Sequence, residues 1–168
     1  MLFEETPIHC TVIENEITRA CQCTLLVARF DKVHPVISGN KLYKLYYFLQ
    51  EALASNHKTI LTFGGAYSNH LAATAFACRQ AGLRSIGIVR GERPAVLSHT
   101  LQQCIELEME LQFVSRTEYA VMSDGANVNN LKDMFGECLV VPEGGYHPNG
   151  AKGASRMMHT INIPNPTH

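Results

Sequence analysis

Four short apolar segments alternate with helix-compatible segments through the middle of this 168-residue chain. The apolar segments have strand length, and the longer stretches between them can form helices. Short, continuously apolar strands separated by helices are typical of a parallel sheet that is buried on both faces. We therefore predict an α/β fold, an open parallel sheet with helices on both faces, with strands at 59–63, 85–89, 111–114 and 138–142.

Further elements are predicted around this layer. The β-branched and apolar run TLLVARF at 24–30 favours another strand. Apolar residues at spacings of three and four between 42 and 53 predict an amphipathic helix before the first of the four strands. The helices predicted between the strands lie at about 68–81, 97–108 and 128–135.

Composition and charge exclude several classes of protein. The formal net charge is −1, and lysines and arginines are scattered, which argues against nucleic acid as a partner. Residues 1–15 lack the basic cluster and apolar run of a secretory signal, and no segment approaches transmembrane length. We therefore expect no membrane partner and a cytoplasmic location, where the six cysteines are reduced. Cys21 and Cys23 have no matching pair at zinc-site spacing, so no metal site is predicted.

Ligands of open α/β sheets usually bind beyond the carboxyl ends of the strands. Three glycine-bearing or polar segments follow the predicted strands, at 64–70, 90–94 and 143–150. The segment 90–94 has the composition of a solvated charged turn, and the glycines at 144 and 145 are by themselves a weak signal. The segment 64–70 is therefore the most informative of the three.

The sequence GGAYSNH, Gly64 to His70, joins a predicted strand to a predicted helix. Two glycines permit a tight turn and a close approach of the backbone to a ligand. Ser68 or Asn69 can cap the helix, whose first amides carry partial positive charge and suit a carboxylate or a phosphate. The alternative is that Ser68 is only an N-cap after a glycine turn.

The sequence SGNKLYKL, Ser38 to Leu45, contains two lysines at the start of a predicted helix. The helix dipole disfavours a positive charge on Lys41, so a partly buried amine there would have a lowered pKa and become a nucleophile. Lys44 lies one turn later, where it can meet an anion or water. The alternative for Lys41 is a solvated lysine beside an amphipathic helix.

Five stretches taken in order carry a resemblance to a known family. They are RFDKVHP, ISGNKLYKL, LTFGGAYSNH, GIVRGE and VPEGGYHPNGAKG, and the resemblance runs from about Arg29 to Lys152. They closely resemble the pyridoxal-phosphate-dependent 1-aminocyclopropane-1-carboxylate deaminase and D-cysteine desulfhydrase family. This resemblance implies a fold type II enzyme (tryptophan synthase beta-like), in which a small α/β domain is set against a larger cofactor-carrying domain.

The resemblance also implies roles for the lysine motif. By this likeness Lys41 forms the imine with pyridoxal 5'-phosphate and later carries a proton. Asn40 helps to position Lys41, and Lys44 approaches the cofactor phosphate. The protein then needs to deliver an amine, an anion cradle and an acid or base, because the cofactor itself spreads the developing charge.

The glycine turn receives roles from the same resemblance. Ser68 lies at the reacting face, where it assists nucleophilic or proton-transfer steps. Asn69 hydrogen-bonds the phenolic oxygen of the cofactor, and the amides from Ser68 to His70 hold the carboxylate of a small amino-acid substrate. The predicted catalytic residues are thus Lys41 and Ser68.

The chain departs from the family pattern in three places. Tyr43 stands where a basic residue is usual, and Ala28 and Phe30 stand where charged residues are common. Family members also continue beyond this length with the rest of the cofactor domain, including its glycine-rich phosphate loop. We expect a truncated, amino-terminal half, which by itself holds pyridoxal phosphate poorly because the main phosphate cradle lies in the other half.

The resemblance suggests three parts. Residues 1–57 are assigned to the larger cofactor domain, 58–146 to the small α/β domain, and 147–168 to the start of the second half and an irregular tail. The leading hypothesis is a lyase or deaminase acting on a small amino acid, with a homo-oligomer as a compatible assembly. The alternatives are a non-catalytic α/β remnant that serves as a binding or oligomerising module, and a flavodoxin-like nucleotide binder. The last ranks lowest because the chain has neither a P-loop nor a G-x-G-x-x-G run.

Overall fold

The centre of the protein is a four-stranded parallel sheet in a computed structural model that describes residues 7–33, 37 and 39–161. The strand order is β5-β4-β3-β6, and all three pairings are parallel. The bounds are Thr59–Gly64 for β3, Arg84–Arg90 for β4, Met109–Val114 for β5 and Leu139–Val141 for β6. The predicted parallel layer is therefore confirmed, and the carboxyl ends of its strands meet at one edge.

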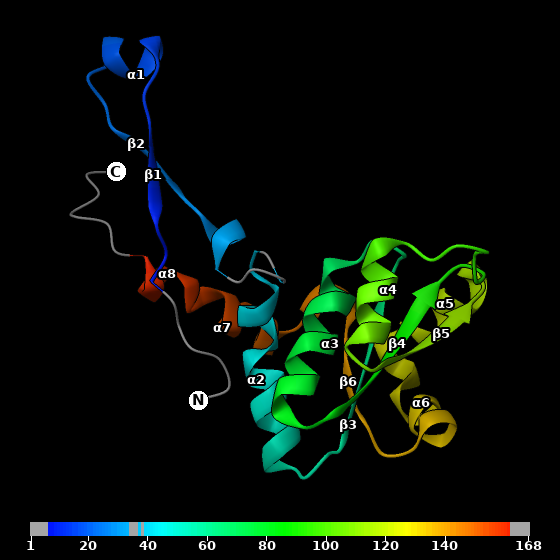
Figure 1. The fold of residues 1–168 in the computed structure, drawn as a ribbon. Coiled ribbons are helices and arrows are strands. Elements are labelled where there is room, and N and C mark those ends of the chain that lie inside the picture. Colours follow the sequence, from blue (N-terminus) through cyan, green and yellow to red (C-terminus); the bar gives the residue numbers. More distant parts are fainter. Residues whose placement is uncertain (1–6, 34–36, 38, 162–168) are drawn as a thin grey trace.

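Helices cover both faces of this sheet, as the sequence predicts (Figure 1). Three of them share a core cluster on one face, and two share a second cluster on the other face. The first group is α2 (Lys41–Ala54), α3 (Asn69–Ala81) and α4 (His99–Glu106). The second group is α5 (Arg116–Met122) and α6 (Val128–Phe135). Helix α5 was not predicted, although Ser115 and Glu118 form a capping box at its start.

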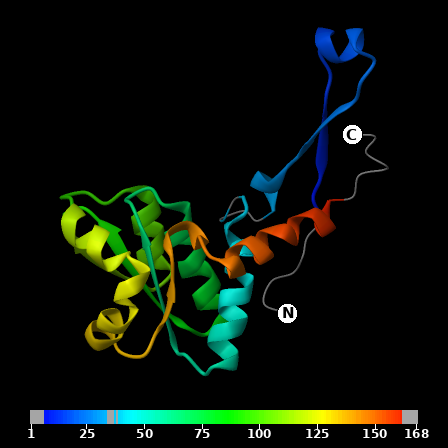
Figure 2. The ribbon, with the colours of Figure 1, turned by 180° about the vertical axis from the view of Figure 1, so that it is seen from behind.

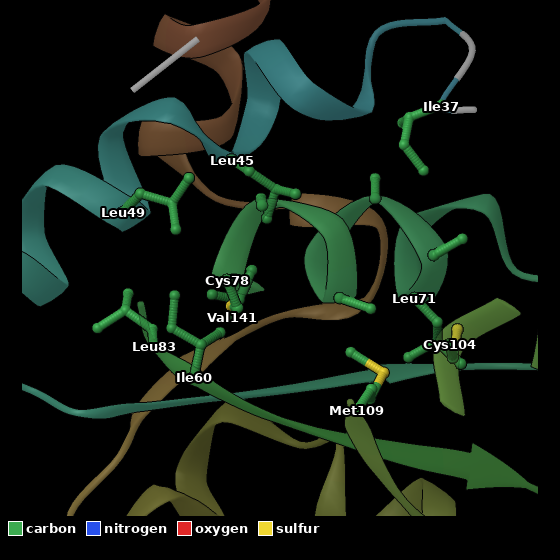
Figure 3. Close-up of a cluster of buried hydrophobic side chains, with 14 of the residues drawn as sticks. Ile37, Leu45, Leu49, Ile60, Leu71, Cys78, Leu83, Cys104, Met109 and Val141 are labelled. Carbon is green, nitrogen blue, oxygen red and sulfur yellow. The ribbon is translucent and has the colours of Figure 1, made fainter. Parts of the chain in front are cut away.

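The larger core cluster joins the first group of helices to the sheet (Figure 3). Leu45 and Leu49 of α2 are fully buried in it, as is Leu71 of α3. Burying one such side chain contributes about 1.5–3 kcal/mol, so this cluster stabilises the packing of α2 and α3 on the sheet. The division between residues 57 and 58 stays a prediction, but α2 shares this core with the sheet.

The amino-terminal part forms an arm that projects from the α/β body (Figures 1 and 2). Strands β1 (Cys10–Ile13) and β2 (Leu25–Ala28) pair antiparallel, with α1 (Glu16–Ala20) at the tip. The predicted strand at 24–30 corresponds to β2, whereas β1 was not predicted. A short 3-10 helix, η1 (Phe30–Lys32), leads from the arm toward the body.

After β6 the chain passes through a 3-10 turn, η3 (Glu143–Gly145), into two further helices. The expectation of an irregular tail from residue 147 differs from the structure, because α7 (Pro148–Ser155) and α8 (Met157–Thr160) are helical. The Pro- and Asn-rich residues 162–168 lie outside the described residues, as does Ser38 of the lysine motif. Ile8 forms a parallel bridge with Ile161, so the described ends lie side by side.

All six cysteines are free thiols, and three are buried in the body. Burial raises the pKa of Cys78 and of Cys104 to about 12, so both stay protonated near neutral pH. Within the described part of the chain, no group of three or more His, Cys, Asp or Glu residues has metal-site geometry. Over the same residues no helix combines the length and apolarity needed to cross a bilayer.

Helix α7 packs directly on the backbone of α2 because it has glycine at the contact. A Cβ atom on Gly153 would clash with the carbonyl oxygen of Tyr43, and one on Gly150 would clash with that of Gly145. Both glycines are buried. The close contact therefore holds η3 and the first turn of α2 against each other.

Replacing Gly153 with alanine should destabilise the fold. The added methyl group overpacks a rigid backbone contact, which typically costs about 1–3 kcal/mol, more than the helix propensity gained. Urea unfolding of Gly153→Ala followed by circular dichroism measures the loss. Gly125→Ala is the matched control, because a Cβ there meets no atom within 4 Å. Equal stability of Gly153→Ala and the control would contradict the close α2–α7 contact.

Candidate active site

Lys41 is the first residue of α2, at the positive end of the helix dipole. Its Nζ donates a hydrogen bond of 3.1 Å to Oδ1 of Asn40. The pKa of Lys41 is lowered, first by partial burial and second by the positive charge of Lys44. Lys41 therefore has the two features that would make its amine nucleophilic, namely partial burial and a position where positive charge is disfavoured.

Lys44 lies one turn further along α2 and is tied to the turn that follows β6. Its Nζ donates to the carbonyl oxygen of Gly144 at 3.3 Å. Its side chain also runs along Gly145, where an added Cβ would lie 3.4 Å from Cβ of Lys44. Gly145 has φ +67°, so both the space and the backbone conformation favour glycine there. The position of this ammonium group thus depends on η3.

The glycine turn after β3 leads into α3 as predicted. Ser68 is the N-cap of α3, and its Oγ accepts a hydrogen bond of 3.3 Å from the amide of Leu71. Gly64 ends β3, and a Cβ there would lie 2.5 Å from Oγ of Ser68. A side chain at position 64 would therefore displace the capping serine. Gly65 occupies the turn between them, and its carbonyl oxygen accepts from the amide of Ser68 at 3.0 Å.

A neighbouring helix fixes the middle of this turn. Ser98 caps α4 by accepting from the amide of Leu101 at 3.2 Å, and its hydroxyl donates to the carbonyl oxygen of Ala66. Asn69 begins α3 and is exposed. The turn is therefore held from both sides while the start of α3 keeps a polar, accessible residue. Such an arrangement suits the binding of an anionic group.

His70 is the buried member of the site. Its Nε2 lies 2.9 Å from Oγ1 of Thr62 in β3, and this hydroxyl donates to the carbonyl oxygen of Val141 in β6 at 2.8 Å. Burial, and after it the positive charges of Lys41 and Lys44, lower the pKa of His70 to about 4. The imidazole is therefore neutral at physiological pH.

Arg90 is a site residue that the sequence did not single out. Its guanidinium lies 3.8 Å from where a Cβ of Gly65 would be, and it stacks over the ring of Tyr119 at 5.3 Å from the centroid. Burial raises the pKa of Tyr119, and the carboxylate of Glu143 acts in the same direction. In the sequence Arg90 was assigned to a solvated charged turn, because nothing local reveals that β4 ends beside β3.

A surface hollow lies elsewhere, between α2, α6 and the turns that follow α5 and β6. Phe48, Phe63, Leu131 and Tyr146 contribute to its lining. It contains none of the predicted site residues, and its lining is largely apolar. The candidate site is therefore defined by converging polar groups at the sheet edge and not by this hollow.

The structure brings the predicted residues to one edge of the sheet. Lys41 and Lys44 of α2 both act electrostatically on His70 of α3, and Asn40 holds Lys41. Ser68 and Asn69 lie at the start of the same α3. The residue roles toward a cofactor or a substrate stay predictions.

No family model matches the chain, but comparisons with individual proteins find similar sequences and structures. A Thermotoga maritima protein provisionally named 1-aminocyclopropane-1-carboxylate deaminase is 39% identical over 132 residues, which is 77% of this chain and 42% of that protein. The mitochondrial bifunctional D-cysteine desulfhydrase/1-aminocyclopropane-1-carboxylate deaminase of Arabidopsis thaliana is 30% identical over 77% of this chain and 34% of that protein. A crystal structure of a homologue of this deaminase superimposes with a TM-score of 0.74 at 26% identity, covering 95% of this chain and 48% of that one.

The fold is that of the fold type II pyridoxal-phosphate enzymes, whose solved structures match nearly the whole chain. Within this class the chain belongs to the 1-aminocyclopropane-1-carboxylate deaminase and D-cysteine desulfhydrase family. It spans a little under half the length of the first curated relatives that it matches.

Protonation of His70 should make the folded state lose stability in acid. Its folded pKa of about 4 lies below the ordinary 6.5, so the unfolded chain binds the proton first as the pH falls. The stabilisation is complete above pH 6.5 and disappears between 6.5 and 4, by roughly 3 kcal/mol in total. Urea unfolding at a series of pH values measures this slope. His70→Gln should flatten this pH dependence, whereas His159→Gln, at an exposed position, should leave it unchanged. Equal slopes in both variants would show that His70 does not have a lowered pKa.

Removing the charge of Lys44 should raise the pKa of Lys41, because Lys44 is one of the two causes that lower it. Lys44→Met therefore should slow acetylation of Lys41 by acetic anhydride near neutral pH, since only the neutral amine reacts. Peptide mass spectrometry over a range of pH gives the rate at each lysine. Lys58→Met, which removes an exposed charge, is the control. A faster reaction of Lys41 in Lys44→Met would contradict the electrostatic coupling.

Proposed function

We propose that this chain provides the reactive amine and an anion cradle of a pyridoxal-phosphate-dependent lyase or deaminase that acts on a small amino acid. The reaction would be of the 1-aminocyclopropane-1-carboxylate deaminase or D-cysteine desulfhydrase type, as the names of its relatives suggest. The observation that carries the proposal is the position of Lys41. It combines partial burial, a lowered pKa and a second lysine one turn away, at the edge where α3 begins.

The donor groups of the site fit pyridoxal phosphate. Lys41 offers an amine whose lowered pKa increases the neutral, nucleophilic fraction. Lys44 offers a positive charge suited to a phosphate, and the exposed Asn69 offers an amide suited to the phenolic oxygen. When bound, the cofactor draws electrons away from the α-carbon of the substrate. The chain itself needs only to position the reactants and to move protons.

Ser68 is suited to meet the substrate because of how it caps α3. Its Oγ uses a lone pair to accept from the amide of Leu71, which leaves its own proton free to be donated outward. The amides from Ser68 to His70 belong to the first turn of α3, where backbone donors and the helix dipole favour a carboxylate. These residues would therefore hold an amino-acid substrate by its carboxylate while Lys41 exchanges a proton at the reacting carbon.

The substrate class follows from the same chemistry. A small substrate with one carboxylate and one amine matches an anion cradle beside a reactive lysine. The name of the Arabidopsis relative specifies D-cysteine and 1-aminocyclopropane-1-carboxylate, which are compounds of this kind. A homo-oligomer and a cytoplasmic location stay predictions from the sequence.

Covalent trapping tests the proposal directly. We expect pyridoxal phosphate followed by borohydride to label Lys41 in preference to the other lysines of the purified chain, even if total labelling is weak. Lys41 should carry most of the label because its lowered pKa increases the fraction of neutral, reactive amine. Peptide mass spectrometry gives the label at each lysine.

The controls separate a site from general amine reactivity. Lys41→Ala should abolish the dominant label, whereas Lys152→Ala should leave it unchanged. Inorganic phosphate added in excess should reduce labelling of Lys41, because it competes for the anion cradle. A label spread evenly over the lysines in the native chain would overturn the proposed function and favour a non-catalytic binding module.

A further inference from the structure

One polar group of the site has no assigned purpose, namely the second ring nitrogen of His70. The hydroxyl of Thr62 carries a single proton, which it donates to the carbonyl oxygen of Val141. The same oxygen can therefore only accept in its contact of 2.9 Å with Nε2 of His70. It follows that Nε2 carries the imidazole proton and that Nδ1 carries a lone pair.

Nδ1 of His70 is buried and, among the described residues, has no hydrogen-bond partner. The residue is only 2% exposed. A buried acceptor without a donor costs free energy, and such a group in a native protein calls for an explanation, such as a catalytic role or an additional polar partner. Nδ1 of His70 is therefore a hydrogen-bond acceptor that has no donor among the described residues.

Two ammonium groups act on this imidazole, but they differ in how they are held. Lys44 is engaged with the carbonyl oxygen of Gly144, and its side chain packs along Gly145. Among the described residues, the hydrogen bond of the Lys41 ammonium is to the side-chain amide of the adjacent Asn40, at the start of α2. Its effect on His70 is also larger than that of Lys44. Lys41 is thus the donor better able to change partners.

We propose that Nδ1 of His70 is a second docking point for the ammonium group of Lys41, which moves between Oδ1 of Asn40 and this nitrogen. The hydrogen bond from Thr62 to Val141 keeps the docking point available, because it fixes the tautomer. His70 is accordingly a positioning residue that acts through Lys41. The inference deepens the proposed function in that it names where the reactive amine rests when it is not engaged.

The proton stays on Lys41 during this exchange. The pKa of His70 is about 4, far below that of an amine, so the imidazole accepts a hydrogen bond without taking the proton. Docking on His70 therefore stabilises the ammonium form of Lys41. Loss of the acceptor should lower the pKa of Lys41, which is opposite to the effect expected for Lys44→Met.

The tautomer is tested first, in the chain without cofactor. Nitrogen-15 nuclear magnetic resonance of histidine-labelled protein at neutral pH should give His70 as a neutral ring with a protonated Nε2 and an unprotonated Nδ1. Thr62→Val should introduce the other tautomer, and Thr62→Ser should restore the native one. A protonated Nδ1 in the native chain would overturn the inference.

The docking point is tested through two substitutions that each keep one half of the imidazole. His70→Gln keeps a donor for Thr62 but has no acceptor at the place of Nδ1, whereas His70→Asn keeps an acceptor near that place and loses the bond to Thr62. Acetylation of Lys41 near neutral pH should become roughly three- to tenfold faster in His70→Gln, as expected from the loss of one hydrogen bond to a charged group. It should stay close to the native rate in His70→Asn.

The outcomes separate this inference from the proposed function. Equal rates in both variants, or a slower reaction in His70→Gln, would refute the docking point even if pyridoxal phosphate labels Lys41. A failure of that labelling leaves the acetylation result untouched, since no cofactor is present in the assay. Should His70→Gln fail to fold, Thr62→Val serves instead, because protonation of Nδ1 in part of the molecules should also speed acetylation of Lys41.

Discussion

The parallel pairing of β3 with β4 on one side and β6 on the other organises the whole candidate site. All residues of β3 are buried, and Ile60 to Thr62 pair in register with Leu139 to Val141. Parallel strands bring their carboxyl ends to the same edge. The glycine turn after β3 and the turn η3 after β6 therefore lie next to each other, although they are far apart in the sequence. The hydrogen bond from Thr62 to Val141 joins the two strands beneath this edge.

The position of the two lysines depends on glycine contacts between α7, α2 and the turn η3. Gly150 and Gly153 let α7 lie against Gly145 and the backbone of α2, where side chains would clash. This contact holds the first turn of α2, with its two lysines, over the turn that follows β6. The geometry of the lysines is thus a consequence of helix packing at some distance from the amines themselves. A change in α7 would reach the site through η3.

Local sequence patterns predicted the parallel sheet and its helices, whereas contacts between segments far apart in the sequence could not be predicted from them. The four strands of the parallel sheet were evident from their apolar runs, and a helix start at Ser68 or Asn69 from the glycine turn before it. The partner of β2 was missed because an antiparallel pairing across a helix leaves no local signal. The buried role of His70 was missed for a related reason. Its contact with Thr62 depends on how α3 packs on β3, and a threonine within an apolar strand was the only hint.

The electrostatics of the site favour a negatively charged ligand. Two lysines one turn apart at a helix start repel each other, and the helix dipole adds to the cost. Each ammonium is offset by a neutral oxygen, from Asn40 or from Gly144, which satisfies its hydrogen bonding without cancelling its charge. Burial first, and the repulsion from these two lysines second, lower the pKa of His70 and keep its imidazole neutral. An anion entering beside α3 would relieve the strain that the lysines create, and this gain is available to a phosphate or a carboxylate but not to a neutral ligand.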